Sequence, residues 1–251
     1  MSSITIRRCC IGEGRPKVIV PIVERTEAAI LQKAAAFSTS SADCVEWRID
    51  CFEGAKDLPA IVHCAAKLRV ALKDQLLLFT FRTKAEGGKV ALAHEEYLHF
   101  IRTVLATDCA DLIDIEFFTA GAELPALIEE AHTAGAAVVC SSHDFHKTPP
   151  RAELVSRMVA MQQAGADLPK LAVMPQSRAD VLELLAATAE MADRHPETPI
   201  ITMSMGALGA VSRLSGEALG SAMTFANPGQ ASAPGQISLE IVNEVLDALH
   251  L

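Results

Sequence analysis

Two residues of this chain, Lys170 and His143, could together carry out covalent and acid–base chemistry. Lys170 lies within a short apolar run, residues 168–174, and His143 follows another such run, residues 136–141. A lysine amine shielded from water can attack a ketone to form an imine, and a histidine can move protons near neutral pH. Taken alone, Lys170 could equally be an ion-pair partner or a phosphate contact. Together the two residues predict a nucleophile with an acid–base partner.

Charged and apolar side chains alternate in the segment Val45-Glu46-Trp47-Arg48-Ile49-Asp50-Cys51. Successive side chains of a strand point to opposite faces, so Glu46, Arg48 and Asp50 would share the face that does not pack on helices. Charges inside a protein cost several kcal/mol each in desolvation unless they pair. The same alternation recurs around Thr80 and Arg82, around Asp114 and Glu116, and around Lys170.

The elements that would position these residues are short strands alternating with longer helices. Eight such units in 251 residues favour a closed (β/α)8 TIM barrel. The alternative, an open doubly wound sheet, would be expected to carry a Gly-rich loop after its first strand, which is missing. The strands are expected at residues 18–23, 44–51, 76–82, 112–117, 136–141, 168–174, 200–205 and 222–226, and the helices at 28–36, 60–71, 91–107, 124–133, 151–164, 178–194, 212–219 and 237–251.

An additional segment precedes the first barrel strand. Residues 4–11, with Gly12-Glu13-Gly14 as a turn, predict a hairpin that closes the bottom of the barrel. No linker or low-complexity tract interrupts the chain, so we expect one catalytic domain spanning residues 1–251.

Barrel geometry divides the interior charges into two groups. Active sites of such barrels lie at the carboxyl ends of the strands, so Lys170, Arg82 and Arg48 are expected to be functional. Burial and neighbouring cations disfavour a charged amine, and we hypothesise that Arg48, Arg82 and Arg213 activate Lys170 in this way. The acidic residues are expected to neutralise Arg48 and its neighbours lower in the barrel; they are Asp50, Asp114 and Glu116.

The composition limits the possible partners and compartments. A formal net charge of −9 argues against a surface that binds nucleic acid or an anionic membrane. No apolar run approaches the roughly 20 residues that cross a bilayer. The seven cysteines form no C-x-x-C pair, which indicates buried thiols rather than a disulfide framework or a zinc site. With no secretory signal at the start, the sequence predicts a cytoplasmic protein.

Several motifs occur in an order and spacing that resemble the type I 3-dehydroquinate dehydratases, over essentially the whole chain. The resemblance implies a (β/α)8 barrel, usually a homodimer, that dehydrates 3-dehydroquinate to 3-dehydroshikimate in the shikimate pathway without a cofactor or a metal. The motifs are Glu46-Trp47-Arg48-Ile49-Asp50, Thr80-Phe81-Arg82-Thr83 with Glu86-Gly87-Gly88, Asp114-Ile115-Glu116, Ser141-Ser142-His143-Asp144-Phe145, Lys170-Leu171-Ala172-Val173-Met174-Pro175, Met203-Ser204-Met205-Gly206, Ser212-Arg213 and Pro234-Gly235-Gln236.

Carried over by position, the resemblance implies three catalytic residues. Lys170 would form the imine with the substrate ketone. His143 would remove the proton next to the imine and later protonate the departing hydroxyl. Glu86, which by sequence alone could be a solvated loop residue, would orient His143 and balance its charge.

The resemblance also implies nine substrate contacts. Arg213 would hold the substrate carboxylate, helped by Gln236 and Ser232. Residues 227–236, rich in Gly and Pro, would form a lid over the pocket, although such a segment is often just a surface loop. The ring hydroxyls would meet Glu46, Arg48 and Arg82, and the apolar walls would be Met203, Met205 and Phe225.

Two positions depart from the family pattern. Ser142 stands where a larger polar residue such as Asn is expected before the histidine. Pro21 stands near the end of the first strand, where relatives often carry a hydroxyl that touches substrate, which puts that contact in doubt.

Three other functions would use some of the same residues. A class I aldolase-type enzyme shares the lysine but cleaves carbon–carbon bonds. A metal-dependent barrel hydrolase would use His143, Asp144 and His146 with the acidic pair Asp114 and Glu116, but the two histidines are spaced poorly for joint ligation. A non-catalytic quinate-binding relative should have lost Lys170 or His143, and this chain has both.

Overall fold

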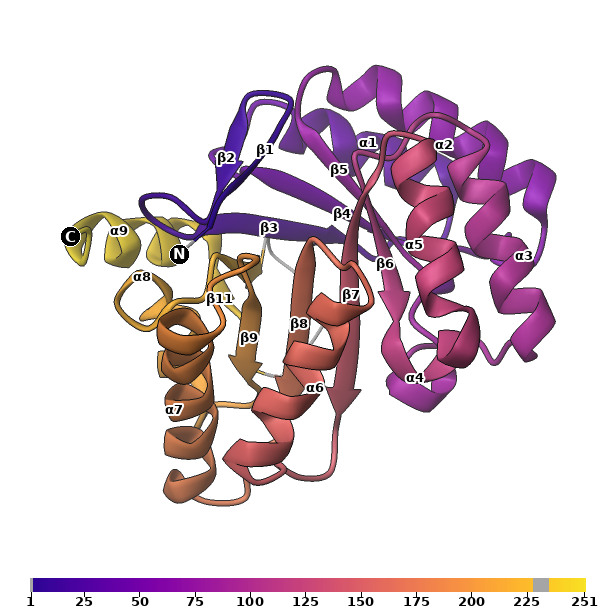
Figure 1. Ribbon diagram of the computed structural model, residues 1–251. Helices are drawn as coiled ribbons and strands as arrows, with labels where there is room; N and C mark the ends of the chain where they lie inside the picture. Colours follow the sequence, from indigo (N-terminus) through magenta and orange to yellow (C-terminus); the bar gives the residue numbers. More distant parts are fainter. Residues whose placement is uncertain (1, 228–234) are drawn as a thin grey trace.

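The computed structural model describes residues 2–227 and 235–251. Eight parallel strands form its centre, and helices surround them (Figure 1). The strands are β3 (Lys17–Ile22), β4 (Cys44–Arg48), β5 (Leu76–Thr80), β6 (Leu112–Glu116), β7 (Ala137–Asp144), β8 (Leu168–Val173), β9 (Ile201–Ser204) and β10 (Met223–Asn227).

The strands pair in chain order from β3 to β9, and β10 pairs with β3 on the other side. A bridge between Ile200 and Ser221 links the starts of β9 and β10, which brings the two ends of the sheet together. A two-residue strand, β11 (Ile237–Ser238), pairs with the end of β10. The predicted (β/α)8 barrel is therefore confirmed.

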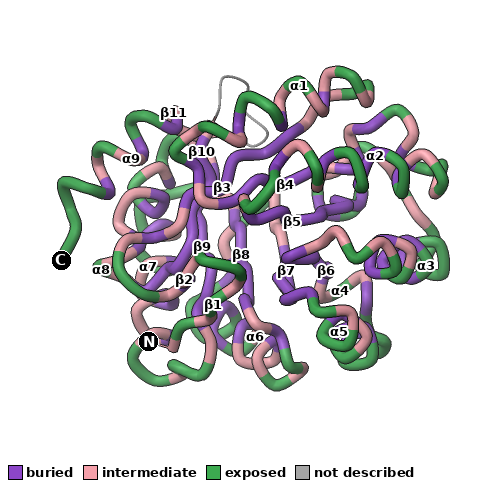
Figure 2. Tube along the Cα trace, turned by 90° about the horizontal axis from the view of Figure 1, so that it is seen from above, coloured by how far each residue is buried: buried purple, intermediate pink, exposed green. Residues whose placement is uncertain are grey.

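Helices follow the strands and form the outer layer, whose outward faces are exposed (Figure 2). Hydrogen-bonding side chains begin several of them; Ser177, for example, accepts the backbone N–H of Asp180 at the start of α7. The helices are α1 (Glu27–Phe37), α2 (Leu58–Leu72), α3 (His94–Leu105), α4 (Phe117–Ala120), α5 (Leu124–Thr133), α6 (Arg151–Gln163), α7 (Arg178–Arg194), α8 (Gly216–Leu219) and α9 (Leu239–Ala248). In the described part of the chain, none is long and apolar enough to cross a membrane.

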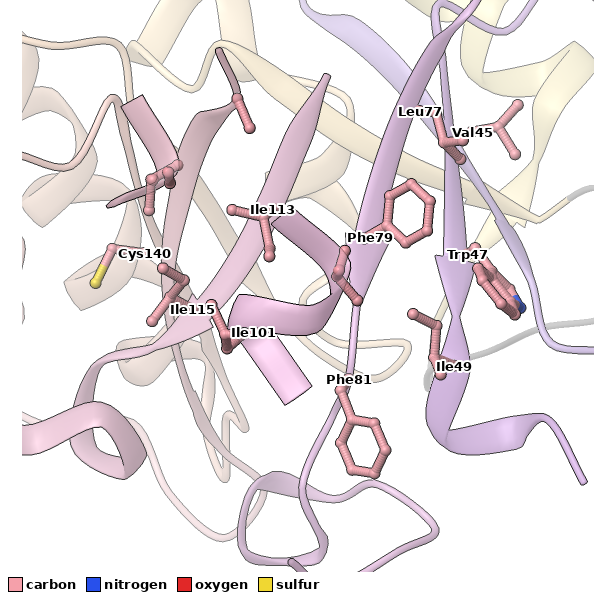
Figure 3. Close-up of a cluster of buried hydrophobic side chains, with 14 of the residues drawn as sticks. Val45, Trp47, Ile49, Leu77, Phe79, Phe81, Ile101, Ile113, Ile115 and Cys140 are labelled. Atoms are coloured by element: carbon pink, nitrogen blue, oxygen red, sulfur yellow. The ribbon is translucent and has the colours of Figure 1, made fainter. Parts of the chain in front are cut away.

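Two apolar layers follow from the alternation of side chains along the strands. Val45, Trp47 and Ile49 point outward and pack with the helices, with the Trp47 ring 5.6 Å from that of Phe79 (Figure 3). A second, smaller cluster fills the lower barrel interior. The predicted assignment of Glu46 and Arg48 to the interior face is confirmed, because both line the central pocket.

The amino-terminal hairpin is confirmed as well, with its turn in a different place. Strands β1 (Ile4–Ile6) and β2 (Cys9–Ile11) pair antiparallel, and the turn is made by Arg7 and Arg8 rather than by residues 12–14. Arg7 adopts a positive φ of 52°, an uncommon conformation that sequence patterns do not reveal. Its guanidinium pairs with buried Asp111, and Ile11 packs into the lower interior cluster.

Several predicted boundaries were wrong by a few residues. The strand predicted at 44–51 ends at Arg48, because Ile49–Cys51 form a 3-10 turn. Strand β7 runs on to Asp144, since β8 continues to pair with it, so His143 lies within the strand rather than past it. The helix predicted at 212–219 divides into a 3-10 turn, Ala210–Arg213, and α8. The last predicted helix begins only at Leu239, after β11.

Candidate active site

A pocket opens at the carboxyl ends of the barrel strands; with the open solvent at its mouth, its empty space is about 580 Å³. It contains eleven of the twelve predicted site residues, while Ser232 and most of the predicted lid lie outside the described residues. The predicted residues that line it are Glu46, Arg48, Arg82, Glu86, His143, Lys170, Met203, Met205, Arg213, Phe225 and Gln236.

Lys170 extends from β8 into this pocket and not toward the helices. Its neighbours Leu171 and Val173 belong to the outer apolar layer, which leaves Lys170 on the interior face. The side chain is 3% exposed, with Nζ 3.2 Å from Asp114 Oδ2 and 4.6 Å from the centre of the Phe225 ring. The amine is therefore enclosed and held by a carboxylate.

Arg82 is the centre of a buried ion-pair network that also includes the lysine. Its Nη1 donates to Glu116 Oε1 at 3.0 Å and to Ser141 Oγ at 2.9 Å. Its Nη2 donates to Asp114 Oδ2 at 2.7 Å, the same oxygen that faces Lys170. The acidic residues neutralise the buried arginine, as predicted, and the substrate contact expected of Arg82 stays a prediction.

His143 and Glu86 form a second buried pair at the pocket wall. The Nδ1 atom of His143 lies 2.9 Å from Glu86 Oε2, which also accepts the backbone N–H of His143 at 3.0 Å. Burial raises the pKa of Glu86 to about 8, despite nearby Arg82. Burial, with help from Arg82 and Lys170, holds the pKa of His143 well below its ordinary value. Both directions disfavour charge on the pair, so a single proton lies between Oε2 and Nδ1, and when it is on Nδ1 the Nε2 lone pair is available to substrate.

The loop that carries Glu86 depends on close backbone approaches. A Cβ on Gly88 would lie 1.8 Å from the carbonyl oxygen of Arg82, and one on Gly87 would lie 2.3 Å from the Phe145 ring. Gly87 also has a φ of +86°, a left-handed conformation that favours glycine. These contacts bring Glu86 against the His143 backbone.

Arg48 and Glu46 extend from β4 into the opposite side of the pocket. The guanidinium of Arg48 makes a two-point contact with Asp50, at 2.8 and 2.9 Å, as the sequence predicted. Glu46 accepts a hydrogen bond from Thr80 Oγ1 at 2.8 Å. Both side chains are held in place by protein partners and still reach the pocket.

Arg213 lies at the remaining side of the pocket beside sulfur and aromatic groups. It is only 1% exposed, and burial lowers the pKa of its guanidinium to about 10. Nη1 lies 3.7 Å from Met203 Sδ. A guanidinium presents its N–H groups in a geometry that matches a carboxylate, so this position suits a ligand carboxylate. Three apolar residues complete this wall, namely Met203, Met205 and Phe225.

Sequence reasoning missed three lining residues and one partner. Phe145 and Ala172 also line the pocket, and each lies two residues beyond a predicted catalytic residue on the same strand or its extension. That period of two was the signal that could have found them. Gly87 lines the pocket too. Asp114 was predicted to be structural, and its contact with the lysine amine was not anticipated.

The two departures from the family pattern lie in different surroundings. Ser142 faces outward and accepts a hydrogen bond from Arg157, at 3.0 Å, so it does not touch the pocket. Pro21 lies beside Glu46 in the strand register, two residues after interior Ile19. It therefore presents an apolar ring to the interior. In the described residues, no group of three or more His, Cys, Asp or Glu side chains is placed to hold a metal ion.

Comparison with known proteins shows the family of the chain. The family model of the type I 3-dehydroquinases matches residues 18–251. The chain belongs to that family. The 3-dehydroquinate dehydratase of Bacillus subtilis strain 168 is 47% identical over 250 residues, covering 100% of this chain and 98% of the relative. That of Salmonella agona strain SL483 is 45% identical, covering 100% and 99%.

A solved type I dehydroquinase has nearly the same fold. The enzyme of Clostridium difficile, crystallised with covalently modified comenic acid, matches with a TM-score of 0.96 at 42% identity. The match covers 99% of this chain and 98% of that one. The chain therefore has the barrel fold of a solved type I dehydroquinase.

Glu86→Gln should change how the stability of this dehydroquinase depends on pH. The pKa of Glu86 is raised from 4.5 to about 8, so between these values the folded state holds a proton that the unfolded state has lost. The contribution of Glu86 to the free energy of unfolding of the wild type therefore falls as pH rises, by up to about 1.4 kcal/mol per pH unit. The variant lacks this loss, and its stability relative to wild type should increase from pH 6.5 to pH 8.

Urea unfolding at several pH values measures the difference. Glu129→Gln, which changes an exposed glutamate on α5, is the matched control and should show no such trend. A constant difference between Glu86→Gln and wild type across this range would contradict the shifted titration of Glu86.

Proposed function

We propose that this protein is a 3-dehydroquinate dehydratase, a hydro-lyase that removes water from 3-dehydroquinate to give 3-dehydroshikimate. The observation that carries the proposal is the meeting of Lys170 and a Glu86-paired His143 in one buried pocket. Membership of the type I 3-dehydroquinase family supports the same substrate.

Lys170 supplies the electron sink for the reaction. A proton on carbon next to a ketone is difficult to remove, because the resulting enolate stores charge poorly. When the amine of Lys170 replaces the ketone oxygen, the protonated imine withdraws electrons far more strongly. The enclosed position of Lys170 also limits access of water that would hydrolyse the imine.

His143 performs both proton transfers. Its lowered pKa keeps the imidazole uncharged near neutral pH, and with the proton shared with Glu86 lying on Nδ1, Nε2 can accept the proton from carbon. The resulting imidazolium then donates that proton to the departing hydroxyl, which leaves as water. Glu86 holds Nδ1 throughout, and the positive charge that appears on the ring meets its oxygen at 2.9 Å.

Cationic and polar groups bind the substrate around this centre. Arg213 binds the carboxylate, assisted by Gln236 and Ser232, and the substrate buries its ring against apolar side chains. The ring hydroxyls are held by Glu46, Arg48 and Arg82, and the apolar contacts are made by Met203, Met205 and Phe225.

Incubation with 3-dehydroquinate tests the activity. The product is a conjugated enone acid, so ultraviolet absorbance should rise with time and in proportion to enzyme. A class I aldolase-type enzyme would instead release carbon–carbon cleavage products, which mass spectrometry of the mixture would detect. Substrate binding without turnover would support a quinate-binding relative and contradict the proposal.

We also propose a pathway, a cellular location and an oligomeric state for the protein. Residues 1–251 would act as one domain in the shikimate pathway, supplying chorismate and aromatic amino acids. All seven cysteines are free, which supports a reducing, cytoplasmic location.

The family resemblance supports a homodimer, and sedimentation equilibrium showing only monomer at micromolar concentration would contradict it. The small anionic substrate is the expected ligand, with no nucleic acid or membrane partner.

A further inference from the structure

We propose that Asp114 is a catalytic residue, the counterion that holds the Lys170 nitrogen and stabilises the protonated imine formed on it. Asp114 Oδ2 lies 3.2 Å from Lys170 Nζ, and the carboxylate is 1% exposed. The inference rests on the proposed imine chemistry. It adds a role for a residue that would otherwise serve only to neutralise Arg82.

The charge balance of imine formation gives this contact its importance. A lysine ammonium and a ketone give a protonated imine and one water molecule, and two of the nitrogen's three hydrogens leave with the ketone oxygen. The nitrogen bears one positive charge before and after, and it keeps one hydrogen. A carboxylate that faces the ammonium of Lys170 can therefore accept a hydrogen bond from the iminium nitrogen without any change in net charge.

The carboxylate of Asp114 is held in position from three directions. Ser141 Oγ donates to Oδ1 at 2.6 Å, and Arg82 donates to Oδ2 at 2.7 Å, beside Lys170. Burial alone would raise the pKa of Asp114, but the cations Arg82 and Lys170 and the Ser141 hydroxyl outweigh it, so the pKa lies below its ordinary value. Asp114 thus remains a fixed anion at the pH of the reaction.

Two other buried carboxylates of the barrel interior pair with arginines and not with Lys170. Asp50 makes a two-point contact with Arg48, and Glu116 accepts from Arg82 and from the backbone and hydroxyl of Thr83. Among the ion pairs of the described residues, Asp114 is the acidic partner of Lys170. A cationic nitrogen surrounded by arginines would be destabilised without it, because like charges at short range repel strongly in a dry pocket.

Asp114→Asn, which keeps the shape and removes the charge, tests the proposal. Cyanoborohydride reduces a protonated imine selectively, so the rate of trapping at Lys170 as a function of pH reports protonation of the imine. We expect kcat to fall about 100-fold or more and the trapping profile to move at least one unit toward lower pH. Glu116→Gln is the matched control, since it removes another carboxylate from Arg82 without touching Nζ, and its trapping profile should match that of wild type.

Two results would overturn the proposal. One is a trapping profile for Asp114→Asn that coincides with the wild-type profile. The other is an equal movement in Glu116→Gln, which would mean that the effect passes through Arg82. If wild type is not trapped at Lys170 at all, the proposed function fails instead, so the two failures are distinguishable.

A measurement on the wild type alone covers the case in which Asp114→Asn does not fold. The C=N stretch of the enzyme–substrate imine, followed by Raman spectroscopy, shifts in heavy water only when the nitrogen carries a hydrogen. With Asp114 as counterion, this shift should persist at pH 9. Its loss at pH 8 would overturn the proposal.

Discussion

Lys170→Met should lower kcat for 3-dehydroquinate by about 10⁴-fold or more, a loss typical of removing a covalent nucleophile. Methionine fills a similar volume without an amine, so no imine can form. Asp114 keeps Arg82 and Ser141 as partners, which limits the loss of stability from an unpaired buried charge. The ultraviolet assay for the conjugated product measures kcat, and thermal unfolding verifies that the variant folds.

Lys170→Arg is the matched control for the structural alternative. Arginine preserves a cation for Asp114, but its guanidinium does not form an imine with a ketone under these conditions. If Lys170 served only as an ion-pair partner, Lys170→Arg would retain most of the activity while Lys170→Met lost it. We expect both variants to be inactive. Near-normal turnover by either would refute the nucleophilic role.

His143→Ala should separate imine formation from proton transfer. Each general acid–base role contributes roughly 10²- to 10⁴-fold, and His143 is assigned two, so kcat should fall by at least about 10³-fold. Lys170 is unaffected, and substrate should accumulate as an imine. Borohydride reduction followed by mass spectrometry of the intact protein should therefore show a trapped adduct in this variant.

His146→Ala provides the control for this experiment. His146 lies three residues further along the same segment, but it is exposed and does not line the pocket. Its kcat should stay within about twofold of wild type. Equal losses in the two variants, or a His143→Ala protein that turns over normally, would exclude His143 as the proton carrier.

The sequence predicted the barrel and its pocket well because both depend on strong periodic signals. The alternation in residues 45–51 placed Trp47 outward and Arg48 inward, as found. A period of two also placed Lys170 on the interior face, since Leu171 and Val173 had to pack against helices. Eight repeated strand–helix units left few other ways to close the sheet.

Features set by tertiary contacts were harder to predict. The partner of Lys170 depends on which of several interior carboxylates lies opposite it, and Asp114 reaches it from two strands away. The extension of β7 through His143 depends on continued pairing with β8. The hairpin turn at Arg7 relies on a positive φ at a non-glycine residue, for which the sequence has no signal.

The hypothesis that arginines crowd the lysine amine also needs revision in detail. Arg82 approaches the same carboxylate oxygen as Lys170, so cation and anion both influence the amine. Arg48 is neutralised by Asp50. The charges around the amine are thus paired with one another, and these pairs fix the positions of Arg48, Arg82 and Lys170.

Reduction of the wild-type enzyme with borohydride in the presence of 3-dehydroquinate tests the central claim most directly. Peptide mapping by mass spectrometry should then locate one added substrate-derived mass on Lys170, with no modification when substrate is omitted. An unmodified Lys170 after complete turnover of substrate, or a mass located on another residue, would contradict an imine at this position.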